Sequence, residues 1–275
     1  MSGSQRRFPG FLTMVVLPAA LLSTLSSCAR PPERQVESKQ FHWAAAKERY
    51  VAGDYNKAIG NLEYLLDGAN EYSSRALPFS LVLTSGVGAG YMELADYYSA
   101  GAKSNKGKAL LFQRKASDYR AMANHMVLHF AENTKKMDLL TGDSIQLSFG
   151  PPKGNAVEPA LFTQIAQGMI LSQVDEEAAL SLAVDRGVLL AVCSITGAQN
   201  NLAKASQILQ RGEFLVRRPQ FMKAVADQLE HESQLYARNK LDDTAKMAML
   251  RQLAQDAIKD DRSSGTAMVL PVAGN

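Results

Sequence analysis

The chain has few cysteines and almost no excess of charge, and both shortages exclude whole classes of protein. Only Cys28 and Cys193 occur in 275 residues, which excludes a disulfide-rich fold and leaves the burial of apolar side chains as the main source of stability. Residues 1–27 hold Arg6 and Arg7 and no acid, so the 30 basic and 27 acidic residues of the chain become 28 and 27 beyond them. A nucleic-acid-binding domain concentrates basic residues in a patch or stripe. We therefore expect no nucleic-acid partner.

Common catalytic signatures are also missing. No serine lies in a G-x-S-x-G turn, which excludes the nucleophile elbow of hydrolases. The segment 86–91, GVGAGY, has Tyr91 where the dinucleotide fingerprint needs glycine, and no Lys-Ser pair follows to form a phosphate loop. The small residues Gly86, Ala89 and Gly90 instead suit close contact between helices. We predict neither an enzyme nor a cofactor-binding protein.

The first twenty-eight residues have the layout of a secretory signal. Arg6 and Arg7 form a basic start, an apolar run covers 8–25, and a Leu-Ser-Ser triplet precedes Cys28. A short apolar run with a small-residue cleavage site is typical of a signal peptide rather than of a spanning helix. The layout resembles the bacterial lipoprotein signal, which implies that Cys28 is acylated and begins the mature protein. An ordinary cleaved signal and a signal anchor are the alternatives.

The same resemblance implies a location and a domain order. Several acyl chains on one residue attach a protein stably to a bilayer, and alanine at position 29 favours the outer membrane over the inner one. With Cys28 acylated, only Cys193 remains, so no intramolecular disulfide can form. We expect a signal peptide at 1–27, a flexible tether at 28–39, a single helical domain at 40–261 and a disordered tail at 262–275.

The chain after the tether has the pattern of paired helices. Apolar residues recur at helical spacing over 41–50 and again over 58–66. Gly53 can end the first helix, Asp54 can cap the second, and the small Ala58 lets the two approach closely. The segment 50–66, YVAGDYNKAIGNLEYLL, resembles one tetratricopeptide (TPR) repeat. We predict an all-α fold, a TPR-like array of antiparallel helix pairs.

Weaker patterns predict the later elements. Further helices are expected from Pro78 through 81–98, and over 108–132, 159–172, 175–194, 200–211, 219–239 and 242–260. The stripe expected to face inward on the helix at 108–132 comprises Leu111, Lys115, Tyr119, Met122, Met126 and Phe130. We expect a polar turn at 101–107 and a surface loop at 141–159, a candidate for function with one strand at 144–149. The apolar stretch 180–195 contains Asp185 and Arg186 and is shorter than the ~20 residues of a membrane span, which predicts a buried helix.

Two histidines are candidate metal ligands. His125 and His129 stand four residues apart on one predicted helix, a spacing at which both imidazoles can reach one ion. Met126 stands where a zinc hydrolase of the H-E-x-x-H type has its glutamate, which excludes that enzyme class. We expect no metal and two half-buried histidines beside a methionine-rich seam. A structural or transport metal site is the alternative.

Five aromatic residues gather in the second helical pair. They are Tyr91, Tyr97, Tyr98, Phe112 and Tyr119. Tyrosine serves recognition because a rigid apolar ring carries one polar group. The cluster therefore predicts either a groove for a partner or ligand, or packing within the core.

Two bacterial families share features with the chain. The lipoprotein signal followed by the TPR-like segment 50–66 resembles TPR-type lipoproteins, including outer-membrane assembly factors that bind peptides or partner subunits. Segments 75–81, RALPFSL, and 111–119, LFQRKASDY, resemble the lipoprotein T component of TRAP transporters, which forms an oligomer and pairs with a periplasmic solute-binding subunit. The segment 78–90 is shorter than in that family, and a tryptophan-rich later helix is missing, so no binding residue is carried over.

These resemblances imply a lipid-anchored adaptor or scaffold that faces the periplasm and binds a protein partner. The alternative is a T component that binds an apolar or organic-acid solute and forms a homo-oligomer.

Overall fold

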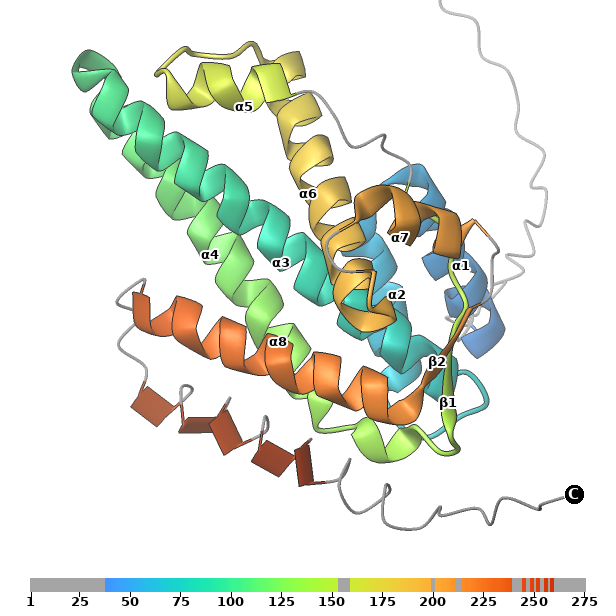
Figure 1. Cartoon of the computed structure of the whole chain (residues 1–275). Helices are drawn as coiled ribbons and strands as arrows, with labels where there is room; N and C mark the ends of the chain where they lie inside the picture. The colour runs from blue at the N-terminus through green and yellow to red at the C-terminus, as the bar shows by residue number, and fades with distance from the viewer. Residues whose placement is uncertain are drawn as a thin grey trace, which may run out of the picture. The chain divides into compact units, whose positions relative to one another are not determined.

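The computed structural model describes one compact unit within Glu37–Asn275. The described residues are 38–152, 159–198, 201–210, 214–238 and the pairs 244–245, 248–249, 251–252, 255–256 and 258–259. They contain eight α-helices and one two-stranded sheet (Figure 1), which confirms the all-α fold built from packed helices. Cys28, the signal peptide and the tail at 262–275 lie outside the described residues, as does nearly all of the tether.

The first two helices form the hairpin that the sequence predicts. Helix α1 spans Lys39–Ala52 and α2 spans Tyr55–Leu66. Gly53 has φ 80°, a left-handed conformation in which glycine costs least, and its N–H bonds back to the carbonyls of α1. The carboxylate of Asp54 accepts from the N–H of Lys57, and Ala58 is fully buried. The predicted roles of Gly53 and Asp54 are confirmed, and α1 begins two residues before the apolar pattern at 41–50 because Ser38 caps it.

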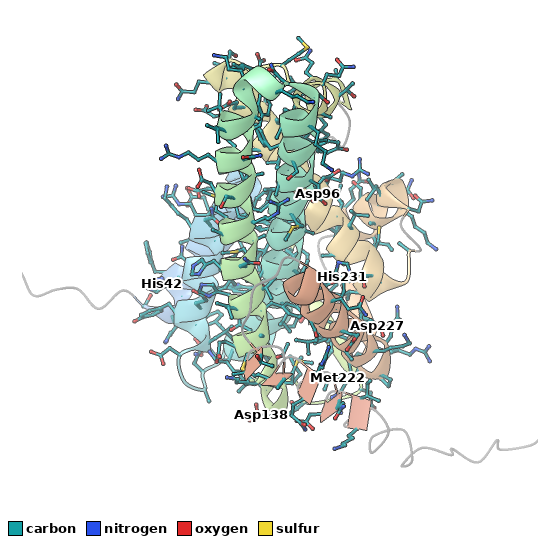
Figure 2. All side chains as sticks on the ribbon, turned by 90° about the vertical axis from the view of Figure 1, so that its left-hand side faces the viewer. His42, Asp96, Asp138, Met222, Asp227 and His231 are labelled. Carbon is teal, nitrogen blue, oxygen red and sulfur yellow. The ribbon has the colours of Figure 1, made fainter. Side chains whose placement is uncertain are left out.

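Helices α3, Ser73–Ser104, and α4, Ala109–Thr134, form a long antiparallel hairpin closed by a 3₁₀ turn at Lys106–Lys108. Figures 1 and 2 show the two helices side by side. The prediction that Pro78 starts a helix is wrong, because α3 begins five residues earlier. Asn70 forms the preceding turn, donating to the carbonyl of Leu65 and accepting from the N–H of Tyr72.

The C-terminal end of α3 also differs from prediction. Gly101 was expected in a polar turn but is buried inside the helix, where a Cβ would lie 2.2 Å from the carbonyl oxygen of Ile165. The helix therefore continues past Gly101, which instead allows helix α5, Pro159–Ala166, to approach α3. Helix α5 ends before residue 172 because Gly168, at φ 79°, turns the chain.

The buried face of α4 differs in part from the predicted stripe. Met126 and Phe130 are buried as expected, but Leu111 and Met122 are exposed. Between 109 and 123 the buried face consists of Phe112, Ala116 and Ala123. Periodicity placed this part of the helix about one residue out of register.

Helix α6, Gln173–Thr196, packs directly on α3 through glycines. A Cβ on Gly86 would lie 2.4 Å from Cα of Val188, and one on Gly90 would lie 2.6 Å from the carbonyl oxygen of Ala183. Gly187 of α6 approaches equally closely from the other side. Helix-to-helix contact therefore explains the glycine-rich segment, as predicted, although Ala89 is exposed.

Helix α6 is the one helix of the described residues that is long and apolar enough to cross a membrane. Most of its apolar stretch is buried inside the protein. Asp185, in the middle of it, is buried and accepts a hydrogen bond from the hydroxyl of Tyr55. The structure therefore uses α6 as a core helix, as the sequence predicts.

Two short strands and two helices complete the fold. Strand β1, Ser144–Leu147, was predicted, and it pairs antiparallel with β2, Phe214–Arg217, which was not. Helices α7, Leu202–Leu209, and α8, Arg218–Arg238, agree with the expected ranges to within two residues. The described pairs between 244 and 259 are helical.

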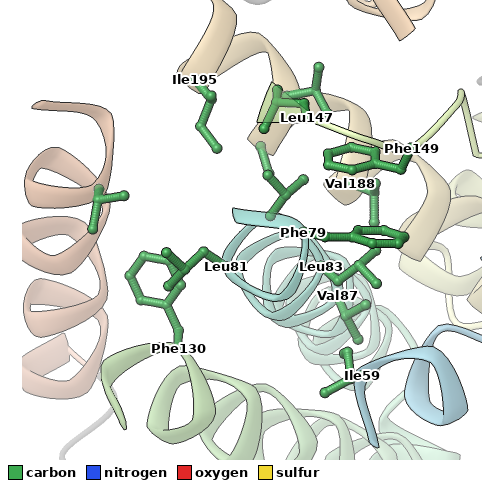
Figure 3. Packing of buried hydrophobic residues seen from close by; sticks show 14 of the residues in the cluster. Ile59, Phe79, Leu81, Leu83, Val87, Phe130, Leu147, Phe149, Val188 and Ile195 are labelled. Atoms are coloured by element: carbon green, nitrogen blue, oxygen red, sulfur yellow. The ribbon is translucent and has the colours of Figure 1, made fainter. Parts of the chain in front are cut away.

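The core surrounds α3, the central helix. Figure 3 shows Phe79 of α3 stacked on Phe149, with ring centroids 4.5 Å apart, beside Leu83 and Val188. Tyr50 of α1 donates a hydrogen bond of 2.6 Å to the carbonyl of Gly150. The described part of the 141–159 loop is therefore tied into the core, and none of the candidate site residues lies in it.

Candidate functional site

Two hollows lie along α2, one on each side of a hydrogen bond that links α2 to α3. The side-chain amide of Asn56 donates to the hydroxyl of Tyr91 over 2.9 Å. Both residues line both hollows. We call the pair of hollows the α2 groove.

The hollow on the α6 side has a volume of about 170 Å³. Its lining residues are Gly53, Asp54, Tyr55, Asn56, Val87, Tyr91, Glu177, Leu180, Ser181 and Val184. Asp54, one of its two carboxylates, pairs with Lys57 at 2.8 Å, and that contact lowers the pKa of Asp54. Because Asp54 also caps α2, its charge has a structural role.

The hollow on the α4 side has a volume of about 270 Å³ and different chemistry. Its lining residues are Asn56, Ile59, Gly60, Glu63, Tyr91, Met122, His125, Met126 and His129. Nδ1 of His129 contacts Oε1 of Glu63, and Nε2 of His129 lies 2.9 Å from Nε2 of His125. The result is a chain of polar groups that runs from α2 to α4.

His129 is half-buried beside methionines, as the sequence predicts, whereas His125 is exposed, which corrects the prediction for that residue. The pair also has a partner that the sequence did not reveal. Glu63 belongs to α2, and no spacing rule relates it to a residue more than sixty positions later. Within the described part of the chain, no group of three or more His, Cys, Asp or Glu side chains is arranged to hold a metal ion.

Four of the five predicted aromatic residues form one continuous stack between α3 and α4. Tyr91 stacks on Tyr119, Tyr119 stacks on Tyr98, and Tyr98 contacts Phe112, with ring centroids 5.6 to 6.3 Å apart. Tyr97 is separate, because it faces α5 and stacks on Phe162 at 4.9 Å. The stack packs the hairpin together, and Tyr91 is the member that faces the α2 groove.

The hydroxyls of Tyr98 and Tyr119 are held in the protonated state. Burial raises the pKa of both Tyr98 and Tyr119, and the nearby carboxylate of Glu176 raises it further. Glu176 pairs with Lys115, whose ammonium stands 5.6 Å from the centre of the Tyr98 ring. Burial likewise raises the pKa of the Cys193 thiol. Neither these two hydroxyls nor the thiol is an activated acid, base or nucleophile near neutral pH.

A second surface feature lies at the tip of the α3–α4 hairpin. Five large apolar side chains are exposed there; they are Leu110, Leu111, Met169, Ile170 and Val174, and we call them the tip patch. Leu110 is 83% exposed and Val174 is 75% exposed.

Hydrogen bonds hold the hairpin end, which carries Leu110 and Leu111, against the α5–α6 loop, which carries Met169 and Ile170. The side chain of Asn105 donates to the carbonyl of Gly168 over 2.9 Å, and Ser104 donates to the carbonyl of Ala166 over 2.8 Å. These bonds fix the α5–α6 loop against the end of α3. The periodicity of α4 did not reveal the patch, because it assigned Leu111 to the core.

The chain has no match among models of known protein families, among curated proteins or among solved structures.

Proposed function

We propose that the protein is a lipid-anchored, non-enzymatic adaptor of the bacterial cell envelope that docks a partner protein on its tip patch. The observation that carries the proposal is the exposure of five large apolar side chains on adjoining segments. A contiguous exposed apolar patch usually marks a surface that binds another protein or a membrane. The lipoprotein-like signal supplies the location.

The surroundings of the patch indicate what kind of partner fits. Lys103, Lys106 and Lys108 are exposed at the hairpin turn, next to Leu110. Asp175 and Glu177 are exposed beside Val174. A partner whose apolar surface has carboxylates facing the lysines and cations facing these two acids would match the patch, because complementary charge favours correct docking. The tip is also fixed by hydrogen bonds, so little ordering cost opposes binding.

Site-specific photo-crosslinking in intact cells tests the proposal. A photoreactive amino acid at position 110 should give one protein adduct of defined mass, and the same label at Leu215 should not. Leu215 is a matched control because it is 65% exposed but belongs to β2, beside the other end of α3 (Figure 1). The substitution Leu110→Glu should abolish co-purification of that partner, whereas Leu215→Glu should leave it unchanged. Adducts with lipid alone, or equal adducts at both positions, would contradict a protein-docking tip.

The alternative drawn from the sequence is a T component of a TRAP transporter that binds an apolar or organic-acid solute. Pockets that bury a small molecule typically have volumes of about 300–1,000 Å³. The two hollows along α2 have about 170 and 270 Å³, and this size favours the adaptor. Co-purification with a periplasmic solute-binding subunit and the transporter's membrane subunits would support the alternative instead.

A further inference from the structure

The α4-side hollow of the α2 groove contains groups that the proposed adaptor function does not use. His125 and His129 place their Nε2 atoms 2.9 Å apart, with ring planes at 89°. Two imidazole nitrogens that share one ion at ~2.0–2.1 Å stand about 2.9–3.5 Å from each other. Both nitrogens can therefore reach a single ion with little movement of either ring.

Glu63 prepares one of these rings for binding. Its carboxylate contacts Nδ1 of His129, and a carboxylate at that position keeps the imidazole proton on Nδ1. The Nε2 lone pair of His129 is then directed toward His125. Metal-binding histidines in proteins usually have such an outer carboxylate, which orients the ring and raises its basicity. Because Glu63 lies on α2, the arrangement exists only when α2 is packed beside α4.

The other donors in the hollow indicate which metal fits. Met122 and Met126 line the same hollow as the two imidazoles. Imidazole suits zinc, copper, iron and nickel, whereas thioether sulfur selects copper in its Cu(I) state. Copper(I) is the ion that both donor types favour.

The α4-side hollow is open to water at one side and has buried apolar residues at its floor. Met122 is 47% exposed and His125 is exposed, so an ion can enter from water, whereas Met126 and Ile59 are buried and form an apolar floor. Thioether sulfur carries no proton, so its binding to the ion does not depend on pH.

We propose that this hollow binds one Cu(I) ion through Nε2 of His125, Nε2 of His129 and a methionine thioether, with Glu63 as a positioning residue. Each Nε2 must give its lone pair to the ion, so a proton that lies between the two Nε2 atoms moves through solvent to Nδ1 of His125 when the ion binds. The proposal is independent of the tip patch.

Anaerobic titration of the full chain in detergent with Cu(I), against a chromophoric Cu(I) chelator, tests the proposal. We expect one ion per chain and a loss of at least about 100-fold in affinity for His125→Ala, because a first ligand is removed. Glu63→Gln should weaken binding by about 10–100-fold, the usual effect of losing an outer carboxylate. His231→Ala, on α8 (Figure 2), is the control and should bind as the native protein does.

The two thioethers are tested separately. Replacing Met122 and Met126 together by leucine keeps their volume nearly unchanged, so the double variant should stay folded by circular dichroism. It should bind Cu(I) more weakly, with Zn(II) binding unchanged, and X-ray absorption should no longer detect sulfur around the copper. Absence of stoichiometric Cu(I) binding, or full affinity in His125→Ala, would overturn the site. Unchanged Cu(I) binding by the double leucine variant would overturn the assignment to copper.

Discussion

Glu232 of α8 carries a carboxyl group that is buried away from water. It is 3% exposed and accepts a hydrogen bond from Gln228. Burial raises its pKa to about 7 from a usual value of 4.5, because the charged form is less stable away from water. The native protein therefore binds more protons than the unfolded chain between these two pH values. Its free energy of unfolding should fall as the pH rises from about 4.5 to about 7.

The substitution Glu232→Gln removes this titration while keeping the side-chain shape and an acceptor for Gln228. We expect the variant to be more stable than the native protein at pH 8, by about 3 kcal/mol at most, and close to it at pH 4. Urea denaturation at the two pH values measures the difference. Glu230→Gln, at an exposed position of the same helix, should change neither value. A constant difference at both pH values would show that the carboxyl does not titrate as inferred.

At the scale of helices, replacing each of two glycines by alanine should change the free energy of unfolding in opposite directions. A Cβ on Gly86 would meet the backbone of α6 at 2.4 Å, whereas a Cβ on Gly60 meets nothing within 4 Å. Gly86→Ala should therefore separate α3 from α6 and lower the free energy of unfolding by about 1–3 kcal/mol or more. Gly60→Ala, in the interior of α2, should raise it by about 0.5–1 kcal/mol. Urea denaturation of both variants measures this, and equal effects would contradict the α3–α6 contact.

Local signals predicted those elements that local contacts determine. Gly53 and Asp54 end and cap adjacent helices through hydrogen bonds within a few residues, so the sequence was sufficient to identify the α1–α2 hairpin. The start of α3 was missed because the side chain of Asn70, not Pro78, ends the preceding turn. Strand β2 was missed because its partner β1 lies about seventy residues earlier, and nothing in its own four residues specifies that pairing.

The candidate sites also contain some features that local sequence predicts and others that depend on contacts between distant residues. The His125–His129 pair follows from the helical repeat alone, whereas Glu63 and the Asn56–Tyr91 bond exist only after α2 docks on the long hairpin. The tip patch required the register of α4 to be known to within one residue. Periodicity is too coarse for that, because Leu110, Leu111 and Phe112 are all apolar and only the last is buried.

At the scale of the whole molecule, the proposed function requires both an anchor and a docking tip, and two variants separate them. Cys28→Ala should release the protein from membranes or block its processing, because the acylated thiol is lost. Membrane fractionation measures this, and Cys193→Ala, at a buried thiol, is the control that should stay membrane-bound. Leu110→Glu should leave the protein in the membrane fraction but lose the partner. If Cys28→Ala fractionates like the native protein, the proposal of a lipid anchor is wrong, and loss of the partner in Leu110→Glu remains a separate test of the docking tip.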